Sequence, residues 1–178
     1  MKKFLRNLFL FLCLVILLSC RNPFSPPSKK GIYYLPSDSP EQVIENLRLA
    51  YNLRDIEAYK KCLHKDSFKF YFDYSDEEIG EILESRWGID SMIWGWSEEV
   101  LSTEVLFSNV EWINLFLLKE YSFYVDSEHW VGIYWYDLDI EPSPVSGVVE
   151  GRARFTLKKE NSNWFIIKWE DFVISGGY

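Results

Sequence analysis

Two histidines and an adjacent Asp–Tyr pair are the side chains of this sequence best suited to acid–base chemistry. His64 and His129 are the only imidazoles in the chain, and an imidazole titrates near neutral pH without a large perturbation. Asp73 and Tyr74 follow a run of alternating aromatic residues, where they could exchange a proton with a substrate. We favour structural roles for these groups, as surface or capping histidines and as a solvated turn. If the protein is an enzyme, the candidate catalytic residues are Asp73, Tyr74 and His64.

Metal and nucleophile chemistry have weaker support. Asp137, Asp139 and Glu141 alternate along a predicted strand, which places three carboxylates on one face about 6.6 Å apart. Calcium takes about six to eight oxygen ligands, usually from a loop, so a solvated strand face is the better interpretation. Helical spacing makes Cys62 a small buried hydrophobe, and no Cys or His pair has zinc-ligand spacing. The sequence predicts no metal and no cofactor.

Aromatic residues, 18% of the chain, are the remaining signal for binding. Aromatic side chains fill cores, but they also form platforms for sugars, sterols and peptides. Three tryptophans lie in an irregular segment beside two glycines, where a pocket rim could form, and two more rings share one face of a later strand. The ligand-binding candidates are Trp87, Trp94, Trp96, Trp130 and Tyr134.

The secondary-structure elements that must position these residues are predicted to begin with helices. Ser39 can cap a helix that begins at Pro40, because apolar residues follow at steps of three and four. Asp55 is a candidate cap for a second helix. Residues 68–72 alternate between buried and exposed character, which predicts a strand, and Ser75 opens a capping box for a third helical section.

The second half of the chain is predicted to be mostly strands. After a helix over about 97–107, four segments have strand patterns, and turn-forming residues join the last two into a hairpin. These strands are expected over residues 110–118, 129–140, 148–159 and 164–174. Helices followed by a largely antiparallel sheet are typical of the α+β class.

The last two strands carry a resemblance to a known family. Residues 151–157 (GRARFTL) and 163–171 (NWFIIKWED) resemble the closing strand, turn and strand of the nuclear transport factor two-like (NTF2-like, SnoaL-like) proteins. The resemblance covers nearly all of residues 40–173. It implies a cone-shaped fold in which N-terminal helices pack on a curved, mostly antiparallel sheet around a pocket.

What the resemblance implies for function is broad. Some members of the family are isomerases, dehydratases, cyclases or epoxide hydrolases, and many others are binding or assembly modules. No catalytic motif of the enzymes maps onto this sequence. Family members frequently dimerise through the sheet, and Val131, Ile133 and Trp135 would lie on the outer face that such a homodimer uses.

The first twenty residues have the composition of an export signal. An apolar run over residues 8–18 would rise about 16 Å as a helix, roughly half of the hydrocarbon core of a bilayer, so a permanent transmembrane helix is disfavoured. Positively charged residues precede the run: Lys2, Lys3 and Arg6.

The end of this segment resembles the lipobox of bacterial lipoproteins. Leu17 lies three residues before Cys20, Leu18 is bulkier than the pattern usually prefers, and Ser19 directly precedes the cysteine. In that family the thiol receives a diacylglyceryl group, the signal is cut just before the cysteine, and the new amino terminus is acylated by a chain such as palmitate. The resemblance predicts lipidation at Cys20 and a stable membrane anchor.

These observations predict three segments. Residues 1–19 are a lipoprotein signal peptide, residues 20–38 a lipidated cysteine with a Pro-rich tether, and residues 39–178 the NTF2-like domain. Loss of the three cations in the signal takes the net charge from −8 to −11, which disfavours nucleic acid as a partner. Arg21 is not the aspartate that commonly retains lipoproteins at the inner membrane, so we expect the cell envelope, preferably the outer membrane.

Two function classes remain open. The first is an envelope lipoprotein with a non-enzymatic domain that binds a small apolar or glycan ligand, or an envelope protein, and it is the one we favour. The alternative is an acid–base enzyme of the isomerase, dehydratase or hydrolase type that acts on a small apolar molecule. A cavity holding a desolvated carboxyl or imidazole group would favour the enzyme, and a cavity filled with side chains would argue against it.

Overall fold

A computed structural model of the protein describes residues 33–73, 85, 92–141 and 149–172. The chain divides into two compact units, Met1–Tyr33 and Tyr34–Tyr178, and the description below concerns the second. The predicted signal, most of the predicted tether and the helical section expected from Ser75 lie outside the described residues. No helix in the described part of the chain is long and apolar enough to cross a membrane.

Two capped helices open the domain, as the sequence predicts. Helix α2 spans Pro40–Leu53, and the Ser39 side chain accepts a hydrogen bond from the Gln42 backbone N–H at 3.4 Å. Helix α3 spans Ile56–Cys62, and the Asp55 carboxylate accepts from the Ala58 N–H at 3.0 Å. These caps satisfy N–H groups that have no partner inside the helix, which fixes where each helix begins.

The third described helix, α5, spans Trp96–Asn109 and follows directly on a short strand. The Glu98 carboxylate accepts the N–H of Gly95 at 3.0 Å, so the first turn of the helix supplies its own cap. The strand, β2, spans Ile93–Gly95 and pairs antiparallel with β1. The sequence predicts the helix but gives an irregular segment where β2 lies.

Within the described residues, six strands form one sheet in the order β2-β1-β6-β5-β4-β3. Neighbouring strands are antiparallel except β1 and β6, which pair in parallel. The remaining strands are β1 (Lys69–Tyr71), β3 (Trp112–Tyr124), β4 (His129–Glu141), β5 (Val149–Glu160) and β6 (Asn163–Phe172). Helices packed on a mostly antiparallel sheet confirm the predicted α+β class.

Strand β3 is longer than the sequence predicts. The pairing of β3 with β4 shifts register between Lys119 and Tyr121, so the strand continues past the expected end at residue 118. A bulge of this kind accommodates one extra residue, after which the pairing of the two strands resumes. The sequence predicts an earlier end because the Lys119-Glu120 pair interrupts the alternation of apolar residues. The predicted β5–β6 hairpin is confirmed, with Asn161 and Ser162 at φ 48° and 72° in the turn.

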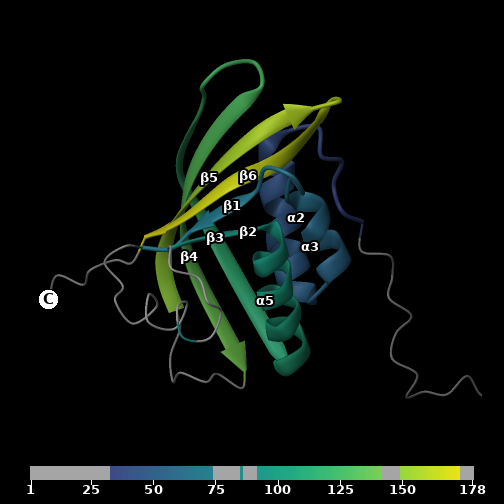
Figure 1. Cartoon of the computed structure of the whole chain (residues 1–178), viewed down its shortest axis with the longest axis vertical. Helices are drawn as coiled ribbons and strands as arrows, with labels where there is room; N and C mark the ends of the chain where they lie inside the picture. The colour runs from purple at the N-terminus through teal and green to yellow at the C-terminus, as the bar shows by residue number, and fades with distance from the viewer. Residues whose placement is uncertain (1–32, 74–84, 86–91, 142–148, 173–178) are drawn as a thin grey trace, which may run out of the picture. The chain divides into compact units, whose positions relative to one another are not determined.

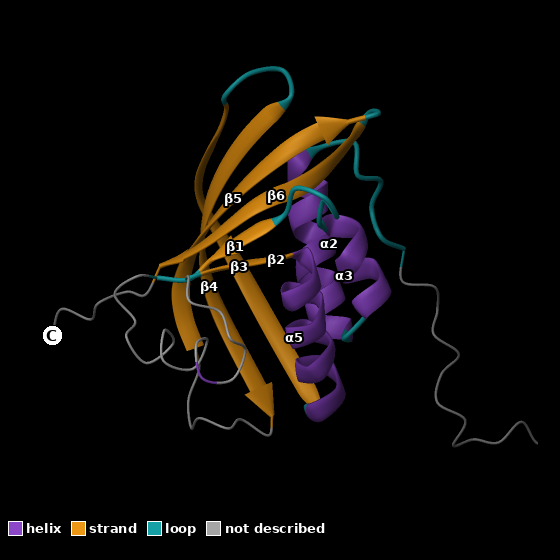
Figure 2. Ribbon diagram, in the orientation of Figure 1, coloured by secondary structure: helices purple, strands orange, loops and turns teal. Residues whose placement is uncertain are grey.

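All three described helices lie against one face of the sheet (Figures 1 and 2). Tyr51 of α2 packs edge-to-face with Tyr59 of α3 and with Phe107 of α5, at ring-centroid distances of 5.4 and 5.3 Å. The largest fully buried side chains come from both layers: Val43, Leu47, Tyr59, Phe68, Trp130, Phe155, Leu157 and Ile166. A cavity lies beside this core, and core residues such as Tyr51 and Leu115 form part of its wall.

Candidate functional site

A cavity of about 290 Å³ lies between α2, α5 and the helix-facing side of the sheet. Its volume is close to the lower end of the roughly 300–1,000 Å³ range of small-molecule sites. Every described strand and two helices contribute to its wall. The lining residues are Tyr51, Phe70, Phe72, Trp94, Glu99, Ser102, Thr103, Leu106, Leu115, Leu117, Tyr136, Leu138, Val149, Trp169 and Asp171.

Strand alternation explains why the wall is largely apolar. Leu115 and Leu117 are two residues apart on β3, so both point toward the helices, and Tyr136 and Leu138 do the same on β4. The sequence correctly places Tyr136 and Leu138 on one face of their strand.

Four aromatic rings form one side of the cavity, three from the neighbouring strands β2, β1 and β6 and one from Phe72, which directly follows β1. The Trp94 ring lies 4.6 Å from Phe72 and 5.8 Å from Phe70, measured between centroids. Phe70 in turn lies 5.3 Å from Trp169. The parallel pairing of β1 with β6 brings Phe70 directly opposite Trp169 and thus assembles this wall.

Glu99 is the most deeply buried acidic side chain in the described part of the chain, at 4% exposure. Its Oε1 atom accepts hydrogen bonds from the Tyr59 hydroxyl and from the Thr103 hydroxyl, the latter at 3.3 Å. Its Oε2 atom accepts from the Trp94 indole N–H at 2.9 Å. Both oxygens are therefore engaged by protein donors, as a buried carboxyl group requires.

Burial raises the pKa of Glu99 above its ordinary value of 4.5, and the three donors oppose that rise. The charged form is the one that loses most on leaving water, so burial favours the protonated acid. Burial also raises the pKa of Tyr59, and the neighbouring Glu99 charge adds to the shift. Tyr59 accordingly stays protonated and remains a hydrogen-bond donor to Glu99.

A second carboxyl group, that of Asp171, lies in the wall beside Tyr136. The Tyr136 hydroxyl donates to Asp171 Oδ1 at 3.0 Å, and burial together with the Asp171 charge raises the pKa of Tyr136. Tyr136 pairs across the sheet with Gly151, and a Cβ atom there would lie only 2.4 Å from the Tyr136 hydroxyl oxygen. Glycine at this position therefore lets the phenol cross β5 and reach Asp171 on β6.

The predicted catalytic candidates lie apart from this cavity where the structure describes them. His64 follows α3, its Nε2 atom lies 2.8 Å from Glu160 Oε2, and it is absent from the cavity lining. Asp73 follows β1 and is likewise absent from the lining, although its neighbour Phe72 is part of it. Tyr74 lies outside the described residues, as does the lipidation candidate Cys20.

The predicted ligand-binding aromatics divide among several locations. Trp94 lines the cavity, and Trp96 lines an open groove beside the start of α5 in which Lys65 Nζ lies 5.7 Å from its ring centroid. Trp130, at 1% exposure, and Tyr134 belong to the packed core. Trp87 lies outside the described residues.

Sequence reasoning missed Glu99 and Asp171. A signal for Glu99 is present, because Glu99, Thr103 and Leu106 fall on one face of a helix that also carries the buried Val100 and Phe107. Two of its donors, Thr103 and Trp94, lie within five residues of Glu99 in the sequence, whereas the third, Tyr59, comes from α3 and has no local signal. For Asp171 the strand position alone does not distinguish a pocket side chain from a solvated one.

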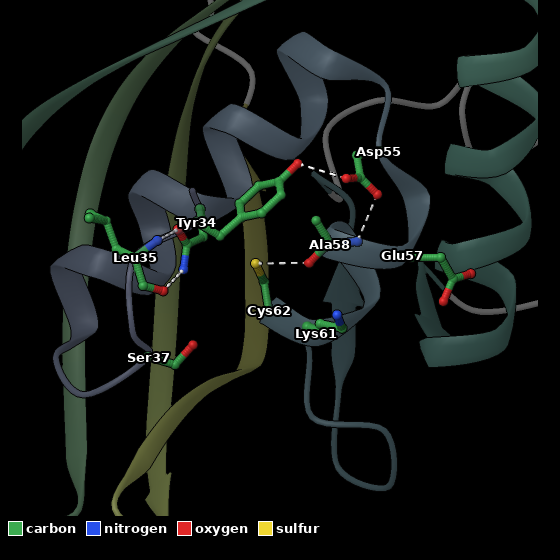
Figure 3. Close-up of a pocket in the computed structure, with 9 residues that line it drawn as sticks. Tyr34, Leu35, Ser37, Asp55, Glu57, Ala58, Lys61 and Cys62 are labelled. Atoms are coloured by element: carbon green, nitrogen blue, oxygen red, sulfur yellow. Dashed lines mark hydrogen bonds between the residues drawn. The ribbon is translucent and has the colours of Figure 1, made fainter. Parts of the chain in front are cut away.

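A smaller cavity, of about 200 Å³, lies where the chain enters the domain. Figure 3 shows the Tyr34 side chain reaching to Asp55, whose Oδ2 atom accepts the Tyr34 hydroxyl at 3.0 Å. The Asn46 side chain accepts the Leu35 N–H and donates to the Leu35 carbonyl, both at 2.8 Å. These bonds fasten residues 34–35 to α2 and α3, which is a structural use of the polar groups around this cavity.

Cys62 lies in the same cavity wall (Figure 3). The side chain is buried, its thiol lies 3.5 Å from the Ala58 carbonyl oxygen, and burial raises the pKa of the thiol to about 12. A thiol is nucleophilic as the thiolate, so this cysteine is unreactive near neutral pH. The prediction of a small buried hydrophobe is confirmed.

Comparison with known proteins identifies the fold. No protein-family model and no curated protein matches the sequence. The chain is similar in structure to an NTF2-like protein of unknown function from Shewanella oneidensis MR-1, with TM-score 0.56, 12% identity, and coverage of 77% of this chain and 98% of that one. It is also similar to a proposed dehydratase of the NTF2-like family from Streptomyces avermitilis, with TM-score 0.60, 10% identity, and coverage of 79% and 96%.

A third similar structure is an uncharacterised protein with a cystatin-like fold from Caulobacter vibrioides, with TM-score 0.58, 10% identity, and coverage of 78% and 89%. At these identities the similarity establishes the fold and leaves activity open. The domain has the NTF2-like fold that the sequence resemblance predicts.

Proposed function

We propose that this protein is an envelope lipoprotein whose NTF2-like domain binds a small, mainly apolar molecule in the cavity between α5 and the sheet. The observation that carries the proposal is the cavity itself, with four aromatic rings on one side and polar groups at few positions. Apolar walls with a small number of polar groups are the usual composition of small-molecule sites. The comparisons agree in fold and leave the ligand open.

Two features support binding over catalysis. Both Glu99 oxygens already accept hydrogen bonds from the protein, and no histidine is among the described residues that line the cavity. The observation that favours the alternative, an acid–base enzyme acting on a small apolar molecule, is the burial of Glu99 itself. Turnover of a ligand that contacts Glu99, abolished by Glu99→Gln, would establish the alternative in place of simple binding.

Filling the cavity is expected to abolish ligand binding. Leu106 lines the cavity from α5, so Leu106→Trp should place an indole in the space that a ligand occupies. We expect 2-naphthol, a neutral probe, to bind the full chain in zwitterionic nanodiscs and to lose at least about tenfold in affinity to the variant. Calorimetry, with empty nanodiscs as the blank, measures both affinities.

The matched control is Leu101→Trp, on the same helix but 51% exposed and absent from the cavity lining. This control should bind 2-naphthol as the unmodified chain does. Equal binding by both tryptophan variants, or no binding by the unmodified chain, would contradict a ligand site in this cavity.

Membrane attachment is expected to depend on Cys20. The apolar run and the residues before Cys20 resemble a lipobox, and stable anchoring takes about two acyl chains. In a bacterial host, Cys20→Ser should leave the signal uncut and remove the diacylglyceryl mass, and the unmodified chain should fractionate with the outer membrane. Cys13→Ser is the matched control, because Cys13 lies inside the apolar run. Intact-mass spectrometry showing Met1 retained, or Cys20 unmodified, would overturn the anchor.

A further inference from the structure

We infer that the open groove beside the start of α5 is a second ligand site, which binds a short neutral oligosaccharide. The inference goes beyond the proposed function, because the groove has its own lining and shares only Trp94 with the cavity. Three properties of the groove carry it: the carbon surface of Trp96, the polar side chains around that ring, and the volume.

Two short segments of the chain line the groove. Residues 65–69 follow α3 and enter β1, and residues 93–98 form the junction of β2 with α5. The antiparallel pairing of β1 with β2 places Lys69 opposite Gly95 and so brings the two segments together. The lining residues are Lys65, Asp66, Phe68, Lys69, Ile93, Trp94, Gly95, Trp96, Ser97 and Glu98.

Trp96 gives the groove an apolar surface. The residue is partly exposed, but its Nε1 atom is buried, so the surface that the indole exposes is carbon. The Lys65 ammonium group lies 5.7 Å from the ring centroid, which places a hydrogen-bond donor beside this surface. Sugar rings carry C–H groups that pack against aromatic carbon, while their hydroxyl groups bond to the polar side chains around the ring.

The polar side chains of the groove include three that are available to a ligand. Lys65, Asp66 and Lys69 are exposed, and among the described residues their side chains have no hydrogen-bond or ion-pair partner. Glu98 differs, because it accepts the Gly95 N–H at 3.0 Å and the Ser97 hydroxyl at 3.2 Å. A sugar hydroxyl both donates and accepts, so lysine donors beside an aspartate acceptor suit it.

Charge and volume narrow the class of ligand. Two lysines and two acidic residues line the groove, so its formal net charge is zero and it attracts neither anions nor cations overall. The volume is about 600 Å³, inside the range of small-molecule sites. This volume holds roughly twenty water-sized groups, which is about the number of non-hydrogen atoms in a disaccharide.

The test measures binding of four neutral disaccharides to the full chain in zwitterionic nanodiscs: cellobiose, maltose, lactose and N,N′-diacetylchitobiose. We expect calorimetry at pH 7 to give at least one Kd below about 1 mM. The anion digalacturonate should bind no more tightly than the best neutral sugar, and the peptide N-acetyl-trialanine amide should not bind.

Two variants locate the bound sugar in the groove. Trp96→Leu should weaken its binding at least about tenfold, and Trp112→Leu is the matched control, because Trp112 is 46% exposed and absent from the groove lining. Asp66→Ala removes an exposed acceptor and should also cost about tenfold. Its control is Asp137→Ala, on an exposed residue of β4 that does not line the groove.

Each outcome is decisive. No binding by any of the four sugars, tighter binding of digalacturonate, or binding of the peptide alone overturns the inference. Unchanged sugar binding by Asp66→Ala overturns it as well, and this variant decides if Trp96→Leu does not fold. Binding of 2-naphthol to the same samples tests the cavity separately: its loss with sugar binding retained overturns the proposed function and leaves the groove as a sugar site.

Discussion

Replacing Glu99 with alanine is expected to lower the free energy of unfolding by about 3–5 kcal/mol. The variant removes the acceptor for Tyr59, Thr103 and Trp94, and each buried donor that loses its partner costs about 1–3 kcal/mol. Stabilities of single domains are about 5–15 kcal/mol, so the loss is a large share of the total. Urea unfolding followed by far-ultraviolet circular dichroism measures it.

Glu99→Gln separates hydrogen bonding from charge. The glutamine retains one acceptor oxygen, so we expect a smaller loss than for alanine. The pKa of Glu99 is raised in the folded state, so its stabilising contribution is complete below its ordinary value of 4.5 and declines as pH rises through the raised value. The advantage of the unmodified chain over Glu99→Gln should therefore shrink as pH increases above about 4.5.

Unfolding curves for both proteins across pH 4 to 8 check this trend, since titrations of distant groups cancel in the difference. Glu104→Gln, on the same helix but exposed, is the control and should show no such trend. A difference that stays constant or grows with increasing pH would show that Glu99 is not held in a desolvated environment.

Local signals in the sequence were sufficient to predict the helices. Ser39 and Asp55 are caps whose side chains bond to the backbone within three residues, so short-range chemistry fixes where α2 and α3 begin. The parallel pairing of β1 with β6 has no such signal. It joins Phe70 to Trp169 across about a hundred residues, and only tertiary packing specifies it.

The same distinction explains which site residues were predictable. Aromatic character predicts a binding role for both Trp94 and Trp130, but Trp94 lines the cavity and Trp130 is buried in the core. A ring on a strand face has the same sequence signature in both places. What separates them is the sheet order and the gap beside α5, and neither is encoded in local spacing.

The face of the sheet opposite the helices carries an exposed apolar surface that we call the outer patch: Leu118, Tyr121, Trp135 and Phe172. Strand pairing places Leu118 opposite Trp135, Trp135 opposite Arg152, and Arg152 opposite Phe172. The side chains of these four residues therefore form a row across β3, β4, β5 and β6. The exposed fractions in the outer patch are 56% for Leu118, 50% for Tyr121, 39% for Trp135 and 37% for Phe172.

We propose that the outer patch is the contact between two copies of this chain. A large side chain buries about 150–250 Å² when fully covered, so four that are about half exposed offer roughly 300–400 Å² of apolar area. This apolar area is roughly half of the ~800 Å² that each partner contributes to a standard interface. Arg152 stands 5.2 Å over the Trp135 ring and pairs with Glu120 at 2.5 Å, which gives the patch a polar rim.

Charging the outer patch is accordingly expected to separate the copies. The full chain in detergent should sediment with twice the protein mass of one chain, and Leu118→Lys should reduce this to one, because a two-fold contact brings the introduced cation to the interface from both sides. Leu101→Lys is the matched control, with 51% exposure on the helical face, and it should leave the dimer intact. A single-chain mass for the unmodified protein at all concentrations, or a dimer that survives Leu118→Lys, would show that the outer patch is not the contact. Neither result would affect the cavity proposal, because the cavity and the outer patch lie on opposite faces of the same sheet.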